Sequence, residues 1–154
     1  MHRFFCRNIT EPVTKLEGTE AHHLVSVMRI KTGEQVELFD GSGTLAEAVI
    51  MRTGKRKAEL KIERISSFIR PERPDIIMAS SIAKGDRFEW LTAKCTELGV
   101  DVIQPVIFER TVKLGKNPRQ VLRWEKICIA SSKQCKRLFL PQIRRPLNLS
   151  EAIG

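Results

Sequence analysis

The sequence predicts an α/β protein in which a small N-terminal β-barrel is followed by the first part of a parallel α/β domain. Residues 1–70 contain short segments of alternating apolar and polar residues separated by turn signals, which is typical of a small barrel. Residues 75–154 instead alternate continuous apolar runs with helical periods, which indicates an open parallel sheet. Between them, Pro71 and Pro74 disfavour helix and interrupt a sheet ladder, so we place the domain boundary there.

The first domain is predicted to hold four strands and one short helix. The helix covers residues 20–29, because Leu24, Val27 and Met28 recur at helical spacing. A turn of sequence Asp-Gly-Ser-Gly at residues 40–43 separates the second strand from the third. The strands are expected at residues 3–7, 34–39, 44–51 and 57–65, and the last of them alternates apolar with charged residues, as on a half-buried strand.

The second domain begins with a predicted strand over residues 75–82, whose near-continuous apolar run is typical of a parallel strand buried on both faces. Asp86 and Glu89 have the spacing of a helix capping box, and Gly99 stands where a helix C-terminal glycine belongs. A second apolar run, over residues 100–108, is expected to form the next strand. The helix between the two strands is predicted to bury a face formed by Phe88, Leu91, Cys95 and Leu98.

The last predicted helix begins at Pro118, a first helical position where proline is tolerated. Its inward face is expected to hold Val121, Trp124, Ile127 or Cys128, Ser131 and Cys135. Its basic residues follow one another at offsets of 4, 3, 7 and 4, and they are Arg119, Arg123, Lys126, Lys133 and Arg137. These offsets keep them near one face, so the positive charge is predicted to form a stripe along a helix.

Positive charge is concentrated in one quarter of the chain. Residues 109–145 contain eleven Lys or Arg residues and two acids, a net charge of +9 that equals the formal net charge of all 154 residues. A solvated helix face normally mixes both signs, whereas a stripe of one sign is suited to a polyanion such as nucleic acid. Nucleic-acid binding is therefore favoured over a merely solvated surface.

The remaining composition narrows the class of protein. Apolar content is ordinary for a globular protein, and no segment approaches the 18 apolar residues of a membrane span. The N-terminus lacks the long apolar stretch of a signal peptide, so we expect a cytoplasmic protein that binds no membrane. The four cysteines, Cys6, Cys95, Cys128 and Cys135, are widely spaced, which predicts reduced thiols and no metal site.

Motifs along the whole chain resemble one known family. In the second domain they are residues 84–90 (Lys-Gly-Asp-Arg-Phe-Glu-Trp), 94–100 (Lys-Cys-Thr-Glu-Leu-Gly-Val), Pro105, 109–111 (Glu-Arg-Thr), 123–127 (Arg-Trp-Glu-Lys-Ile), 134–137 (Gln-Cys-Lys-Arg) and Pro141. In the first domain they are His22-His23-Leu24 with Val27-Met28-Arg29, and Leu38-Phe39-Asp40-Gly41. They look like the small-subunit (16S) ribosomal RNA uridine-N3 methyltransferase family, of the knotted SPOUT class with an N-terminal PUA-like barrel.

This resemblance implies an activity, a cofactor and partners. The activity is methylation of N3 of a uridine in 16S ribosomal RNA, with S-adenosylmethionine as the methyl donor and no metal. The implied partner is ribosomal RNA, in the assembled small subunit. Members of the family also form a homodimer through the knot region, so we do not expect these 154 residues to form that dimer. Uracil N3 is a weak acid, so a cation near O2 or O4 would stabilise the anion formed when the imide proton leaves. Candidates for this catalytic role are Arg110 and Arg137, with phosphate binding as the open alternative.

The residues expected to bind RNA lie in both domains. Arg29 and Lys31 lie near a turn of the barrel, which suits recognition of RNA shape. In the second domain they are Arg119, Arg123, Lys126, Lys133, Gln134 and Arg137. Gln134 either hydrogen-bonds a base edge or is a satisfied residue within the helix.

The chain departs from the family's usual pattern at two positions and at its end. Lys133 stands where the family usually has Glu, and Lys136 stands where it usually has Gly. The family holds its methyl donor in a C-terminal knot with a Gly-Pro-Glu-Gly-Gly loop, and these 154 residues contain no such loop. We therefore expect a chain truncated before the knot, with no cofactor-binding residue of its own and no activity alone.

Two other functions stay open. A non-catalytic RNA-binding module would keep the barrel and the basic helix but do no chemistry, and the missing donor loop favours it for this polypeptide. An α/β enzyme acting on a small anionic metabolite is less favoured, because the sequence has no glycine-rich phosphate loop. A Gly-Pro-Glu-Gly-Gly-like loop in the downstream coding sequence would favour the methyltransferase.

Overall fold

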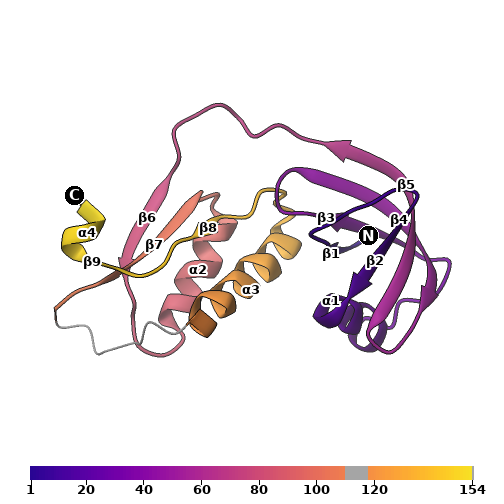
Figure 1. The fold of residues 1–154 in the computed structure, drawn as a ribbon, viewed down its shortest axis with the longest axis horizontal. Coiled ribbons are helices and arrows are strands. Elements are labelled where there is room, and N and C mark those ends of the chain that lie inside the picture. Colours follow the sequence, from indigo (N-terminus) through magenta and orange to yellow (C-terminus); the bar gives the residue numbers. More distant parts are fainter. Residues whose placement is uncertain (110–117, 154) are drawn as a thin grey trace. The chain divides into compact units, whose positions relative to one another are not determined.

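A computed structural model describes residues 1–109 and 118–153 of the chain (Figure 1). The chain divides into two compact units, residues 1–71 and 72–154. The first is built mainly from strands, and the second combines a parallel sheet with helices, so the predicted α/β class is confirmed. Within the described residues, no helix is long and apolar enough to cross a membrane.

The first unit is a five-stranded sheet that curls around one apolar core (Figure 1). Its strands are β1 (His2–Phe5), β2 (Val13–Glu17), β3 (Gln35–Phe39), β4 (Thr44–Thr53) and β5 (Lys57–Ser67), in the order β1-β3-β4-β5-β2. β1 pairs with β3 in parallel, and the other neighbours are antiparallel. The ladder between β4 and β5 shifts register twice, and bulges of this kind bend a sheet.

The curl brings the two edge strands, β1 and β2, next to each other. The Sγ of Cys6, which follows β1, lies 3.9 Å from the carbonyl oxygen of Lys15 and 3.8 Å from Oγ1 of Thr14, both on β2. Among the described residues no ladder joins β1 to β2, so the unit is a half-barrel with an open seam. The alternation of the strands predicts the sheet but not its closure, which depends on how far the sheet bends.

Alternation places one face of the sheet in the core. Val36 and Leu38 of β3, Ile50 of β4 and Leu60 of β5 are all buried. Between β2 and β3 the chain forms α1 (Gly18–His22) and a π-helical turn, η1 (His23–Val27), where the sequence predicts one helix. Leu24 of this segment is buried and closes the core from the helical side.

The second unit is a parallel sheet with its helices at the connections. β6 (Ile77–Ser81) pairs with β7 (Val102–Ile107), and the other edge of β7 pairs with two short strands, β8 (Gln142–Ile143) and β9 (Leu147–Asn148). Helix α2 (Arg87–Glu97) joins β6 to β7, α3 (Pro118–Cys135) precedes β8, and α4 (Leu149–Ile153) follows β9. Periodicity in the sequence does not predict β2, β8, β9 or α4, because segments of two to five residues give little periodic signal.

A proline explains why β8 and β9 are separate strands. The backbone N–H of Arg144 donates to the carbonyl of Ile103, so the backbone of Ile103 faces the segment that contains β8 and β9. Pro105, two residues farther along β7, faces the same segment, but as a proline it has no backbone N–H to donate to it. The buried side chain of Gln104 bridges the gap, with Nε2 donating to the carbonyl oxygens of Pro105 at 2.9 Å and Arg145 at 3.0 Å. The neighbouring strand is therefore split in two.

β6 does not have the burial that its apolar run predicts. Ile76, Ile77 and Met78 are 51%, 52% and 38% exposed, whereas β7 is buried along most of its length. Within the described residues β6 pairs only with β7, so it is an edge strand with incomplete cover. The apolar run predicts a strand that needs cover on both faces, and without a second neighbour among the described residues its apolar side chains are left exposed.

The helices α2 and α3 pack on each other through residues that the periodicity predicts. The rings of Phe88 and Trp124 have centroids 4.5 Å apart, and Cys95 and Cys128 are buried farther along. Two predicted inward residues are instead exposed. Cys135 is the last residue of α3, and Leu98, which is 82% exposed, follows the end of α2.

The start of α2 also differs from the prediction. The carboxylate of Asp86 makes no capping hydrogen bond, so the capping box is not formed. The backbone of Asp86 contributes instead, because its carbonyl accepts the N–H of Trp90 at 2.9 Å. The spacing of Asp and Glu is necessary for a capping box, but Asp86 has φ −84° and ψ 2° rather than the extended backbone that a capping residue usually adopts.

Candidate RNA interface

The basic residues of α3 lie along the face opposite its buried residues. Trp124, Cys128, Ser131 and Ser132 are buried and define the inward face. Arg119, Arg123 and Lys126 are exposed on the other side, at offsets of four and three. Lys133 continues the same line and is half-buried. We call Arg119, Arg123, Lys126 and Lys133 the basic face of α3.

Arg123 forms a two-point ion pair with the neighbouring helix. Its Nε lies 2.7 Å from Oε1 of Glu89, and its Nη2 donates to Oε2 at 3.0 Å. The Arg123 side chain remains largely exposed, and exposed pairs contribute only about 0–1 kcal/mol. Arg123 is therefore held by a surface ion pair and not by a buried one.

Arg137 is separated from the basic face because α3 ends at Cys135. Its Nη1 donates to the carbonyl of Thr96 at 2.9 Å, and its Nη2 donates to the carbonyl of Val100 at 2.8 Å. The side chain is only 13% exposed. These bonds satisfy carbonyl groups at and beyond the end of α2, which gives this guanidinium a structural task that its position in the sequence does not reveal.

A buried carboxylate joins three parts of the second unit. Asp101, whose side chain is 2% exposed, accepts from Nη1 and Nη2 of Arg73 at 2.6 and 3.1 Å and from the N–H of Ile76 at 2.9 Å. On its other side, Nη2 of Arg137 lies 3.6 Å away. The sequence analysis does not identify Asp101. An acid at the start of a buried apolar run is the signal for it, because a buried charge needs partners.

The end of α3 presents Gln134 and Lys136 at the surface. Within the part of the chain that the structure describes, the Gln134 side chain makes no hydrogen bond, so its amide is open to a ligand. Lys136 has φ 62°, the left-handed conformation that commonly follows a helix and favours glycine. The glycine usual at this position in the resembling family therefore has a backbone reason.

In the first unit, Arg29 and Lys31 lie on an exposed turn after η1. Arg29 has φ 55°, which is also left-handed, and Lys31 donates its backbone N–H to Oε1 of Glu34 at 2.9 Å. Ile30 between them is buried, which anchors the turn and leaves both cationic side chains exposed. The nearby ring of His23 packs against Phe4, with centroids 5.9 Å apart, as a residue of the core edge.

Arg110, the other candidate catalytic residue, lies outside the described residues. Within residues 72–109 and 118–153, the loops that follow the parallel strands contain one glycine, Gly85. These loops do not contain the glycine-rich segment with which the resembling family holds its methyl donor. We therefore assign none of the described residues to binding of the methyl donor. Over the same residues, no three His, Cys, Asp or Glu side chains are grouped to hold a metal ion.

Two family models match this chain. One, described as an RNA methyltransferase domain, matches residues 71–154, and the other, described as an RNA methyltransferase PUA domain, matches residues 16–63. The chain is 29% identical over 145 residues to ribosomal RNA small subunit methyltransferase E of Synechocystis sp.. That alignment covers 94% of this chain and 47% of the relative. The chain spans about half the length of the curated relatives it matches.

Solved structures resemble the chain over both units. Ribosomal RNA small subunit methyltransferase E from Neisseria gonorrhoeae, bound to S-adenosyl methionine, has a TM-score of 0.88 and 30% identity, and covers 99% of this chain and 64% of its own. A Legionella pneumophila protein in complex with the bound cofactor SAM has a TM-score of 0.91 and 31% identity, with coverage of 98% and 64%.

Proposed function

The chain belongs to the RNA methyltransferase family whose model matches residues 71–154, and on this premise we propose that it serves the S-adenosylmethionine-dependent methylation of N3 of a uridine in 16S ribosomal RNA. The observation that carries the proposal is the basic face of α3. It lies inside the matched domain and places four basic side chains along one side of a helix, an arrangement that suits a phosphate backbone. We place the reaction in the cytoplasm, on RNA of the small ribosomal subunit.

In this proposal the basic face of α3 holds the RNA backbone. Arg119, Lys126 and Lys133 contact successive phosphates, and Arg123 exchanges the carboxylate of Glu89 for a further one. Gln134, at the last turn of the same helix, offers its amide to a base edge or a ribose hydroxyl. The turn bearing Arg29 and Lys31 in the first unit supplies a second, smaller contact that orients the RNA.

The chemistry at N3 requires a cation beside the base. Loss of the imide proton leaves a negative charge shared between O2 and O4, and a fixed guanidinium lowers the energy of that anion. Arg110 follows the carboxyl end of β7 in the sequence, the edge at which parallel sheets bind their ligands, so it is our candidate for this task. Arg137 acts as a positioning residue that fixes the end of α2 against the start of β7.

Salt dependence of RNA binding tests the basic face. We compare the wild-type chain with Arg119→Ala/Lys126→Ala, and with Lys61→Ala/Arg64→Ala as a matched control that removes two exposed cations from β5. The slope of log affinity against log salt should fall by roughly 1.4 to 1.8 for the α3 variant, since each lost phosphate contact removes about 0.7 to 0.9. The control should keep the wild-type slope, and equal slopes for all three chains would refute the proposed interface.

A second measurement separates the enzyme from the RNA-binding module. The described residues contain no glycine-rich loop for the methyl donor, which favours the non-catalytic RNA-binding module for this chain taken alone. We would incubate it with small ribosomal subunits and labelled S-adenosylmethionine, and identify methylated nucleosides by mass spectrometry. N3-methyluridine would establish the enzyme, RNA binding without methyl transfer would establish the module for this chain, and methylation at another atom would correct the proposed chemistry.

A further inference from the structure

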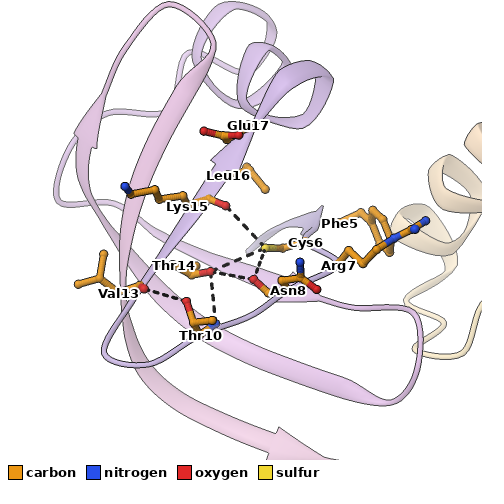
Figure 2. Close-up of a pocket in the computed structure, with 10 residues that line it drawn as sticks. All are labelled: Phe5, Cys6, Arg7, Asn8, Thr10, Val13, Thr14, Lys15, Leu16 and Glu17. Atoms are coloured by element: carbon orange, nitrogen blue, oxygen red, sulfur yellow. Dashed lines mark hydrogen bonds between the residues drawn. The ribbon is translucent and has the colours of Figure 1, made fainter.

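The first unit contains a groove along its open seam (Figure 2). Its volume is about 520 Å³, and it is lined by residues 5–8, Thr10 and the strand β2. β1 and β2 are the ends of the sheet order, so within the described residues each pairs with one neighbour only. The groove is therefore a consequence of incomplete closure of the half-barrel, and its size lies in the range of ligand sites, about 300–1,000 Å³.

The floor of the groove is fixed by hydrogen bonds before any ligand arrives. Oγ1 of Thr14 donates to the carbonyl of Asn8 at 3.2 Å and accepts the N–H of Thr10 at 3.4 Å, while Oγ1 of Thr10 donates to the carbonyl of Val13 at 3.0 Å. The buried thiol of Cys6 adds a contact to the carbonyl of Asn8 at 3.4 Å. The loop after β1 is thus tied to β2, and a preorganised site loses little entropy on binding.

One rim of the groove combines an aromatic ring, a guanidinium and a carboxamide. Figure 2 shows Phe5, Arg7 and Asn8 on one side of Cys6, with Val13 and Lys15 on the other. Phe5 is half-buried and held edge-to-face by Phe39, with centroids 5.5 Å apart. Arg7 and Asn8 are exposed, and in the described part of the chain their side chains make no hydrogen bond or ion pair.

These three groups match the three parts of an unpaired nucleotide. Aromatic rings stack on unpaired bases, a guanidinium binds phosphate, and a carboxamide offers both a donor and an acceptor to a base edge. We propose that the seam groove binds one unpaired nucleotide of the RNA substrate, with Phe5 under the base, Asn8 at its edge and Arg7 on the phosphate. The inference rests on the proposed function, since that function makes RNA the ligand.

Two measurements with single-stranded hexauridylate as the probe test the groove. In ¹H–¹⁵N spectra of the full chain, the probe should shift the backbone amides of residues 5–10 and 14–17. In affinity measurements, Asn8→Ala should weaken binding roughly ten-fold with an unchanged salt slope, because it removes a contact to a base edge and no contact to a phosphate. Arg7→Ala should lower the salt slope by roughly 0.7. Arg52→Ala, an exposed arginine of β4 outside the groove, should match the wild type.

The outcomes separate this inference from the proposed function. If the chain binds hexauridylate but the amides of residues 5–10 and 14–17 do not shift, and Asn8→Ala binds as the wild type does, the groove proposal is wrong while the basic face of α3 retains its role. If the wild-type chain binds neither hexauridylate nor ribosomal RNA at low salt, both proposals are overturned. Thermal unfolding of each variant shows that a lost contact is not a lost fold.

Discussion

The two units of the chain bury their apolar residues in different ways. The first curls a largely antiparallel sheet until one face encloses a core, so its strands alternate cleanly between buried and exposed residues. The second uses a parallel sheet, in which β7 is buried along most of its length and β6 keeps exposed apolar side chains. A curled sheet can bury its own apolar face, whereas a parallel sheet needs other elements to cover both of its faces.

The two units also differ in which parts of the chain their buried charged residues join. In the first unit, the inner ion pair joins Arg3 to Glu37, directly opposite each other on the paired strands β1 and β3, with Nε and Oε2 2.9 Å apart. In the second, Asp101 ties together residues from the start, middle and end of the unit. The Arg3–Glu37 pair stabilises two strands that backbone hydrogen bonds already join, whereas the Asp101 contacts hold together segments that are far apart in the sequence.

The largest expected effect concerns association. A chain of residues 1–71 should be a monomer that unfolds cooperatively, while the full chain should self-associate through the exposed apolar side chains of β6. Ile77→Lys should reduce this association, because it places a charge on the exposed strand. Size-exclusion chromatography with light scattering over a range of concentrations measures it, and a full chain that stays monomeric throughout would remove the contrast between the units.

Breaking the Asp101 contacts should destabilise the second unit by about 3–5 kcal/mol, because Asp101→Ala removes a buried carboxylate that faces the largely buried guanidinium of Arg137 and accepts hydrogen bonds from Arg73 and from the N–H of Ile76. Both tryptophans, Trp90 and Trp124, lie in this unit, so their fluorescence during urea unfolding reports on it selectively. Glu37→Ala is the matched control, since it should shift the circular dichroism transition of the first unit and leave the tryptophan transition in place. Coincident shifts in both variants would mean that the units unfold as one.

Among the described residues, each unit also contains one non-glycine residue in a left-handed conformation, Arg29 in the first and Lys136 in the second. Lys136→Gly should raise the stability of the second unit by roughly 0.5–1 kcal/mol, because glycine avoids a penalty of about 1–2 kcal/mol and loses part of the gain to chain entropy. Arg29→Gly should do the same for the first unit. Lys136→Ala and Arg29→Ala, which remove the charge without freeing the backbone, are the controls, and the same gain in these variants would place its cause in the side chain.

The smallest effect is on thiol reactivity. Cys135 is exposed, whereas burial raises the pKa of Cys128 to about 11 and also raises the pKa of Cys6 and of Cys95. At pH 8 one thiol should therefore react quickly with a disulfide reagent, and Cys135→Ser should abolish that phase. With rising urea, Cys95 and Cys128 should become reactive before Cys6 if the second unit is the less stable one. If Cys6 became reactive first, the first unit would be the less stable of the two.

Local patterns in the sequence were sufficient where a residue's neighbours lie close along the chain. Alternation predicted the strands of β3, β4 and β5, and helical spacing predicted the faces of α2 and α3 on which Phe88 and Trp124 meet. The line of Arg119, Arg123, Lys126 and Lys133 follows from the same spacing, because a helix of known period fixes which side chains share a face.

By itself, then, the sequence determined the class of fold and the common face of α3 on which Arg119, Arg123, Lys126 and Lys133 lie. Only the tertiary structure decided that Arg137 turns away from that charge to hold Thr96 and Val100, that Asp101 is a buried anchor, that β6 is exposed and that the half-barrel leaves a groove. The contacts of Arg137 and Asp101 join residues tens of positions apart, and the exposure of β6 and the groove depend on how the strands are covered and how far the sheet bends. A helix that stops two residues early, or a sheet that bends short of closure, changes partners without changing any local pattern.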